Sequence, residues 1–448
     1  MASTYLSKTF GQAGNRRTFT ISYWLKMGPV STGASPAILS AAQDGSNSDD
    51  LYIHTGRLNF SGYYGSTQYI VRTTAKYRDL SGWYHHVIRF DTTQSTASDR
   101  VRLYVNGELQ TALDNNTYPS QNFQTSYINT ARAHTIGSFA TSPPNSPLDG
   151  SLSHFHFCDG YSYGADSFGS TDATTGEWKI NTSPSVSYGT NGFFILKDGN
   201  SVTDQSGNTN NFTVGGGTLT KTEDCPSNVF CTMNPLNAVY ISFLQGNNTI
   251  SGGNNGSDYS YIGSTLAANS GKFYWEVKAA DLAEIDQVGV ALASSSFTGI
   301  GLGGGLQNNF GGKSVQFSNG NKAGDSAQSA HMGGFSEDDI MMVALDLDNN
   351  KITFGRNGQW SNGSGGADQT YANSTAAFTN LTAGEYYMPA HAMRGYGGNT
   401  GISRYNFGNG YFATTAVSSA GTNASNIGIF EYDVPSGFTA LSTKGLNL

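Results

Sequence analysis

Two carboxylates, Glu284 and Asp286, lie two positions apart in a strand-like run and are the first candidates for a catalytic pair. Side chains two apart on a β-strand share a face, and two carboxyl groups about 5 Å apart serve as nucleophile and general acid in retaining glycoside hydrolysis. A strand motif E-x-D-x-x-E would supply such a pair, but Gly289 stands where the second glutamate belongs. We therefore predict that this segment is not catalytic and that the protein is not an enzyme.

A second set of oxygen-bearing side chains lies in one predicted loop, formed by Asp44, Asn47, Asp49 and Asp50. Calcium takes hard oxygen ligands of this kind, so calcium is the one cofactor that the sequence suggests. The loop lacks the bidentate glutamate of an EF-hand, and an ordinary turn rich in Asp and Asn is the alternative.

Histidines occur in two pairs, His85 with His86 and His154 with His156. The second pair shares a strand face and could chelate a metal, whereas adjacent residues of a strand point to opposite faces. A zinc site needs three or four ligands, and the sequence places no third ligand beside either pair. We therefore favour packed or surface histidines over a zinc site.

Tyrosines set among Gly and Ser in predicted loops are the remaining candidates for recognition. Exposed tyrosine with adaptable polar neighbours is typical of binding surfaces, including surfaces that stack sugar rings. The alternative is that these residues only cover the sheets. The set comprises Tyr63, Tyr64, Tyr69, Tyr161 and Tyr163.

The composition indicates a β-rich protein with many turns and a nearly neutral surface. Only 12% of the 448 residues are charged, 12% are aromatic and 57 are glycine, whereas disorder needs few aromatics and high net charge. The net charge of −8 argues against a nucleic-acid partner. We expect no membrane insertion and no secretion signal, because no apolar run approaches ~20 residues and the N-terminus lacks the signal pattern.

Alternating apolar and polar residues in the first part of the chain predict short strands. Residues 17–26 place Phe19, Ile21, Tyr23 and Leu25 on one face, and residues 100–107 end in an Asn-Gly turn. The motifs FTISYWLK, WYHHVI before VRLYVNGE, and the later LDGSLSHFHF resemble the laminin G type of concanavalin A-like jelly roll. This resemblance implies an antiparallel β-sandwich over residues 1–175.

The second part of the chain carries three further strand motifs. These are GKFYWEV, QVGVAL and a hairpin MVALDLDNNKITFGRNG that folds back at residues 348–350, where Asn tolerates positive φ. Their order resembles the SPRY family, whose members are binding modules, and implies a second sandwich over residues 227–415. In that family the partner surface is made by loops at one edge. Here those loops would include residues 294–310 and Arg394 to Asn399, with Arg394 and Tyr396 as candidate contacts.

Two shorter segments complete the predicted organisation. Residues 176–226 form a connector rich in Gly, Asn and Ser with one strand candidate at residues 192–197, which is a candidate to complete the first sandwich. Residues 416–448 form a C-terminal segment. The fold class is therefore all-β, with two antiparallel sandwiches.

The order of these segments, with CTMNPLN before the second sandwich and YDVPSGFTAL near the end, resembles a group of structural proteins of marine phages. The resemblance implies a protein of the virion surface, made in the host cytoplasm and present in several copies or as a homo-oligomer. Its expected role is a capsid decoration, a short appendage or a tail-fibre or tip subunit. The expected partners are other virion proteins and a host-surface glycan. A polysaccharide-depolymerising hydrolase and a cellular lectin-like adhesin are the alternatives.

Overall fold

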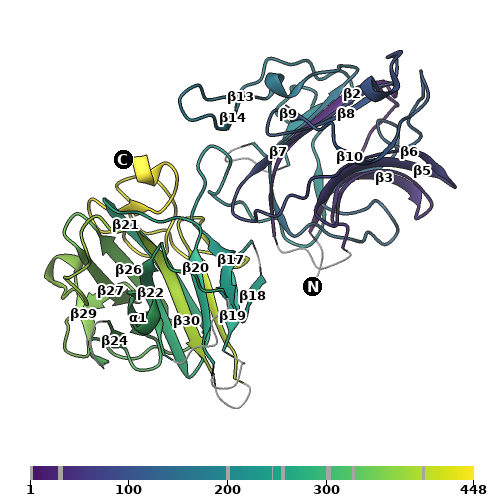
Figure 1. Cartoon of the computed structure of the whole chain (residues 1–448). Coiled ribbons are helices and arrows are strands. Elements are labelled where there is room, and N and C mark those ends of the chain that lie inside the picture. The colour runs from purple at the N-terminus through teal and green to yellow at the C-terminus, as the bar shows by residue number, and fades with distance from the viewer. Residues whose placement is uncertain are drawn as a thin grey trace. The chain divides into compact units, whose positions relative to one another are not determined.

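A computed structural model of the chain describes residues 4–28, 34–197, 202–244, 246–253, 258–298, 304–324, 328–395 and 399–447. The chain divides into two compact units. The first comprises Met1–Lys221 with Cys225–Ser227, and the second Thr222–Asp224 with Asn228–Leu448 (Figure 1). Each unit is built around two large antiparallel sheets, so the predicted all-β class with two sandwiches is confirmed.

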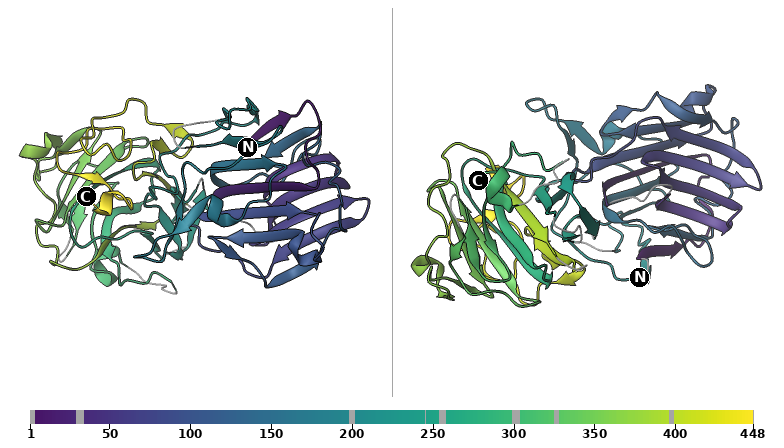
Figure 2. Two further views of the ribbon diagram at one scale, coloured as in Figure 1. Left: turned by 90° about the horizontal axis from the view of Figure 1, so that it is seen from above. Right: turned by 60° about the horizontal axis from the view of Figure 1, so that its bottom comes forward.

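The first unit has an eight-stranded sheet and a six-stranded sheet, whose strands Figure 2 shows side by side. The order in the larger sheet is β10 (Leu113–Thr117), β6 (Thr67–Thr73), β5 (Arg57–Tyr64), β4 (Asn47–His54), β3 (Ala37–Asp44), β11 (Ala133–Ile136), β1 (Tyr5–Thr9) and β16 (Thr213–Gly216). The order in the smaller sheet is β15 (Phe193–Ile195), β12 (Gly150–Asp159), β2 (Thr18–Met27), β7 (Tyr84–Asp91), β8 (Val101–Val105) and β9 (Glu108–Leu109). A separate ribbon pairs β13 (Gly169–Thr171) with β14 (Trp178–Ile180).

Strand periodicity explains the core between the two sheets. The alternate residues Phe19, Ile21, Tyr23 and Leu25 of β2 are fully buried in it, as the sequence predicts. Full burial of one such side chain contributes about 1.5–3 kcal/mol, so the alternating set fixes the register of this central strand. The predicted Asn-Gly turn after β8 also forms, with φ of +48° and +85° at Asn106 and Gly107.

The two sheets of the first unit differ in what covers their outer faces. On the smaller sheet, Val87 and Cys158 are buried under Ala165 and Phe168, and Trp178 packs against the same cluster. On the larger sheet, the outward residues of β3 to β6 are mostly polar or aromatic and line a groove. The open, grooved face of the larger sheet is therefore the candidate binding surface of the first unit.

The second unit has a seven-stranded and a nine-stranded sheet, and Figure 1 shows β22, β30 and β20 in one layer with β21, β26 and β27 in the other. The first has the order β17 (Met233–Val239), β20 (Ser260–Ser264), β30 (Tyr387–Arg394), β22 (Ile285–Leu292), β23 (Lys313–Gln316), β24 (Asn321–Ala323) and β25 (Ser329–Ala330). The second has the order β18 (Ile241–Leu244), β19 (Thr249–Gly252), β31 (Gly401–Asn406), β21 (Lys272–Asp281), β26 (Ile340–Asp346), β27 (Lys351–Arg356), β28 (Gln359–Ser361) and β29 (Ala367–Gln369), while β34 (Thr439–Ala440) pairs in parallel with β21.

Helices play a small part in the described residues. They are the four-residue α1 (Leu306–Asn309) and four 3-10 turns, η1 (Ala97–Asp99), η2 (Ala165–Ser167), η3 (Tyr371–Asn373) and η4 (Gly445–Asn447). A short ribbon of β32 (Tyr411–Phe412) and β33 (Thr415–Ala416) completes the regular structure. In the parts of the chain that can be described, no helix has the length and apolar character to cross a membrane.

The core of the second unit lies between its two sheets and includes Trp275, Val288 and Phe354. The hairpin between β26 and β27 closes as predicted, with φ of +54° at Asn350. Both outer faces carry further apolar clusters. Phe430 and Phe438 of the C-terminal segment pack on Tyr274 of one sheet, and Phe297 and Phe310 pack on the other.

The segment predicted as a connector contributes strands to the first unit. Its residues form β14, while β15 pairs with β12 and β16 pairs with β1. The strand candidate at residues 192–197 therefore coincides with an edge strand of the smaller sheet.

Candidate functional site: a groove on the open sheet face

The groove is built from the outward residues of four neighbouring strands. Along β4 the odd-numbered residues Asp49, Leu51 and Ile53 are buried on the core side. The even-numbered residues, which point to the opposite face, all carry hydrogen-bonding groups and line the groove: Ser48, Asp50, Tyr52 and His54. Strand β5 continues the pattern with Ser61 and Tyr63.

Strand register sets these side chains in rows across the sheet. One row joins Ser40 of β3, Asp50, Ser61 and Ile70 of β6. Directly paired residues have Cβ atoms about 5 Å apart, so each row is a continuous band of contacts. The groove has a volume of about 510 Å³, and the loop residues Phe139, Thr141 and Asn145 close one side. This volume falls within the usual range for small-molecule sites, roughly 300–1,000 Å³.

Asp50 is the central polar group of the groove. Its Oδ1 accepts a hydrogen bond from Ser40 Oγ at 2.6 Å, and its Oδ2 accepts one from Ser48 Oγ at 2.5 Å. Burial raises the pKa of Asp50 to about 6, aided by the nearby Asp49 charge and opposed by the two serine hydroxyls. At neutral pH the group is therefore an ionised acceptor held in place by two donors, a suitable partner for ligand hydroxyl groups.

Aromatic rings flank this carboxylate. Tyr63 is 43% exposed on the groove. Tyr52 packs edge-on against Phe139, with the ring centroids 5.5 Å apart. Partial burial raises the pKa of Tyr52, although the hydrogen bond to Ser61 opposes this rise, so Tyr52 remains neutral near pH 7. The groove thus offers flat apolar surfaces next to hydroxyl and carboxylate groups.

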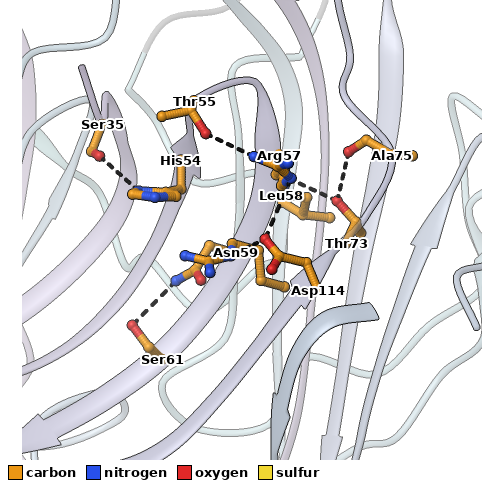
Figure 3. A network of polar contacts seen from close by, with 11 residues as sticks. Ser35, His54, Thr55, Arg57, Leu58, Asn59, Ser61, Thr73, Ala75 and Asp114 are labelled. Atoms are coloured by element: carbon orange, nitrogen blue, oxygen red, sulfur yellow. Dashed lines mark hydrogen bonds and ion pairs between the residues drawn. The ribbon is translucent and has the colours of Figure 1, made fainter. Parts of the chain in front are cut away.

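A network of polar contacts lies next to His54, which lines the groove (Figure 3). His54 Nδ1 lies 3.3 Å from Ser35 Oγ. Directly across the sheet from His54, the Nε of Arg57 lies 3.4 Å from Asp114 Oδ2, and the Nε of Arg72 donates to the same oxygen at 2.8 Å. Partial burial lowers the pKa of His54, and the two arginines add to this effect. His54 is therefore neutral at pH 7, and the arginines carry the positive charge.

Beneath the groove, Asp49 fixes the sheet to a loop. The fully buried carboxylate accepts hydrogen bonds from the Tyr64 and Tyr69 hydroxyls at 2.6 and 2.8 Å and from the backbone N–H groups of Tyr127 and Ile128 at 2.8 and 3.0 Å. Desolvation raises its pKa even though all four donors favour the ionised form. A β-carbon at Gly62 would stand 2.7 Å from Asp49 Oδ1, so glycine is needed there.

The four residues predicted to bind calcium are not brought together. Asp49 points into the core and Asp50 into the groove, because adjacent strand residues face opposite sides. Asp44 accepts hydrogen bonds from the Asn47 amide and the Ser46 backbone at the turn between β3 and β4. Among the described residues, no cluster of three or more His, Cys, Asp or Glu side chains could hold a metal ion. The local structure is an Asx-type turn followed by a strand.

The predicted tyrosine set is distributed over three environments. Tyr63 lines the groove, whereas Tyr69 is a fully buried core residue and Tyr64 packs against the same core. Tyr161 is 42% exposed and stacks on Tyr163 at 5.8 Å, away from the groove. The loop prediction was wrong for Tyr63, Tyr64 and Tyr69, because these residues belong to β5 and β6.

Of the candidates in the second unit, Arg394 is the last residue of β30. The Arg394 guanidinium stacks over the Tyr259 ring at 4.9 Å, and Tyr396 lies outside the described residues. Asp286 of the carboxylate pair is fully buried, with an oxygen in contact with His391 Nε2, while Glu284 is exposed. The two carboxyl groups therefore do not share an open face, as hydrolysis requires.

The paired histidines of the first unit are packed. His85 accepts a hydrogen bond from the Trp178 indole at 3.0 Å, and His86 lies 3.0 Å from the Tyr23 hydroxyl. Burial lowers the pKa of both imidazoles to about 3. His154 and His156 are also buried, so the expectation of packed histidines is confirmed for all four.

Sequence reasoning missed the groove residues Ser40, Tyr52, His54 and Ser61. A signal was present: the outward positions of two successive predicted strands all carry polar or aromatic side chains. One such strand is typical of any solvated sheet face. Recognising the groove needed the register between strands, which single strands do not reveal.

Comparisons with known proteins bear on the first unit most directly. Residues 3–161 match the family model Laminin_G_3, described as the concanavalin A-like lectin/glucanases superfamily. The matched residues include all four strands that line the groove. The expected laminin G-like domain is therefore confirmed for this part of the chain. Comparison with curated proteins gives no match.

Solved structures of SPRY domains are among the structural neighbours. The SPRY domain of human HERC1 has a TM-score of 0.30 at 17% identity, covering 39% of this chain and 96% of that one. A human SPRY domain has a TM-score of 0.26 at 14% identity, with 38% and 95% covered. The TRIM65 PSpry domain has a TM-score of 0.28 at 15% identity, with 39% and 91% covered.

Proposed function

We propose that the protein is a non-enzymatic binding protein and that the sheet-face groove takes a glycan chain. The observation that carries the proposal is the combination of two tyrosines with a carboxylate and serine hydroxyls in one groove of about 510 Å³. A sugar ring presents an apolar face that packs on aromatic rings and hydroxyl groups that need hydrogen-bond partners. The family match over the same strands supports this class of ligand.

Carboxylate placement favours binding over hydrolysis. Asp44 and Asp50 are the acidic residues that line the groove. Asp44 pairs with Asn47, which is three residues from Asp50 on β4, so the strand rise separates the two acidic positions by about 10 Å along the sheet. Retaining and inverting glycosidases place their carboxyl groups about 5 Å and about 6.5–9.5 Å apart. The separation of the two backbone positions is longer than either spacing, which supports binding rather than hydrolysis.

A glycan array with purified protein tests the groove. Tyr63→Ala is expected to weaken binding to the selected glycan by roughly five- to 150-fold, if a sugar ring gains from one aromatic ring about the 1–3 kcal/mol that a stacked nucleic-acid base gains. Tyr161→Ala is the matched control, since Tyr161 is 42% exposed and Tyr63 43%. Loss of binding in the control with retention in Tyr63→Ala would move the site to the Tyr161–Tyr163 pair. Absence of glycan binding by the wild-type protein would contradict the proposal.

The proposal extends to the place of binding, the surface of a phage particle. The order of segments along the chain supports this placement through its resemblance to phage structural proteins, and many copies on one particle would raise avidity without new contacts. Other virion proteins would then be its structural partners. Immunogold electron microscopy of particles from the source is expected to give label on the capsid or the tail. Unlabelled particles, with an antibody shown to bind the folded protein, would favour a cellular lectin-like adhesin.

A further inference from the structure

Positively charged side chains gather beside His54, a residue that lines the groove and pairs with Arg57 across the sheet. Arg57 and Arg72 both contact Asp114, so two guanidinium groups share a single carboxylate. Lys76 follows β6, the strand that carries Arg72. It lies close to Gly56, the residue before Arg57, because its Cβ is 3.6 Å from the position that a β-carbon on Gly56 would take. These three side chains form a cationic patch in a chain whose net charge is −8. A local charge of opposite sign to the whole molecule steers anionic groups toward it.

A buried acceptor lies between the tyrosine and the arginines. Asn59 faces Tyr52 on one neighbouring strand and Arg72 on the other. Its side chain is fully buried and donates to Ser61 Oγ at 3.3 Å, while its Oδ1 has no hydrogen-bond partner among the described residues. An unsatisfied buried acceptor costs about 1–3 kcal/mol, and such a group in a native structure is often completed by water or a ligand.

We infer that the groove continues past Tyr52 to Arg57 and Arg72, and that this end binds an anionic substituent of the glycan, a sulfate ester or a carboxylate. The inference rests on the proposed function and names the class of glycan. Asp50 and His54 are four residues apart on β4, about 13 Å by the strand rise. One glycan chain of a few sugar units can therefore span the carboxylate and the cationic end. Guanidinium groups match sulfate and carboxylate oxygens by paired hydrogen bonds.

Binding to matched polymers tests this inference with the full chain. The probes are dextran, dextran sulfate and polygalacturonate, measured by biolayer interferometry at several salt concentrations. We expect the wild-type protein to prefer at least one anionic polymer over dextran by about tenfold or more. The double variant Arg57→Gln, Arg72→Gln is expected to lose this preference. Preference for dextran sulfate alone would indicate that Arg57 and Arg72 bind sulfate. Preference for polygalacturonate alone would indicate that they bind carboxylate.

The control variant is Arg102→Gln, which removes one arginine of a comparable ion pair, 2.7 Å from Asp99, on the other sheet. It is expected to keep the preference, which separates a site from general charge attraction. Equal loss in the control, an unchanged preference in the double variant, or no preference in the wild type would overturn the inference. If Tyr63→Ala still weakens glycan binding in those cases, the proposed function stands without the anionic end. Circular dichroism verifies folding of each variant.

Discussion

At the scale of single residues, the alternation of side chains along a strand decides which acidic groups reach the groove and which are buried in the core. Asp49 and Asp50 are adjacent, yet one is a buried structural anchor and the other a groove residue. Their loop-like sequence suggested one shared calcium site. Because the segment is a strand, the two carboxylates diverge by necessity.

The titration of Asp50 gives a prediction about stability. Its pKa is raised from 3.8 to about 6, so the folded protein binds more protons than the unfolded chain between these values. The stabilising contribution is present below pH 3.8 and is lost as pH rises through about 6. We expect this loss to lower the free energy of unfolding by about 1–2 kcal/mol, after allowance for the partial exposure of Asp50. The Asp50→Asn variant should not show this pH-dependent decrease. Urea unfolding at pH 4 to 7 measures it, and identical pH profiles for both proteins would contradict the prediction.

At the scale of elements, each unit uses a buried carboxylate to hold a loop on a sheet. Asp49 accepts two backbone N–H groups of Tyr127 and Ile128. Glu276 of β21 accepts those of Glu431 and Tyr432 at 2.9 and 2.8 Å, together with the Tyr274 hydroxyl and the Asn406 amide. Burial raises the pKa of Glu276 to about 7. The C-terminal segment is thereby tied to the second sandwich.

The two anchors should respond differently to amide replacement. In Asp49→Asn the new amide can face two tyrosine hydroxyls, which rotate to accept, so we expect a loss below about 1 kcal/mol. In Glu276→Gln either amide orientation faces a backbone N–H, because the two backbone donors occupy different oxygens. We expect a loss of about 1–3 kcal/mol. Thermal unfolding of both variants measures the contrast, and equal losses would contradict it.

The sequence predicted those elements that depend only on residues close together in the chain. Alternation placed Phe19 and Ile21 in the core, and Asn106 and Asn350 marked hairpin turns. The groove could not be predicted in the same way, because it depends on four strands meeting in a particular register. The buried anchors were also beyond local patterns, since Asp49 and Ile128 are 79 residues apart.

At the scale of the whole molecule, each unit was expected to be an antiparallel sandwich, and this is the architecture found. Their outer faces differ in a way that composition does not reveal. The second unit adds apolar clusters to both faces, while the first leaves the β3–β6 face polar and hollowed. The open face concentrates the candidate binding groups in the first unit.

A crystal structure of the protein with a glycan selected on the array tests most directly whether the groove binds the glycan. The proposed function predicts a sugar ring packed against Tyr63 or Tyr52, with a hydroxyl group within hydrogen-bonding distance of Asp50. Ligand density confined to another surface, such as the Tyr161–Tyr163 pair or the Arg394 region, would contradict it.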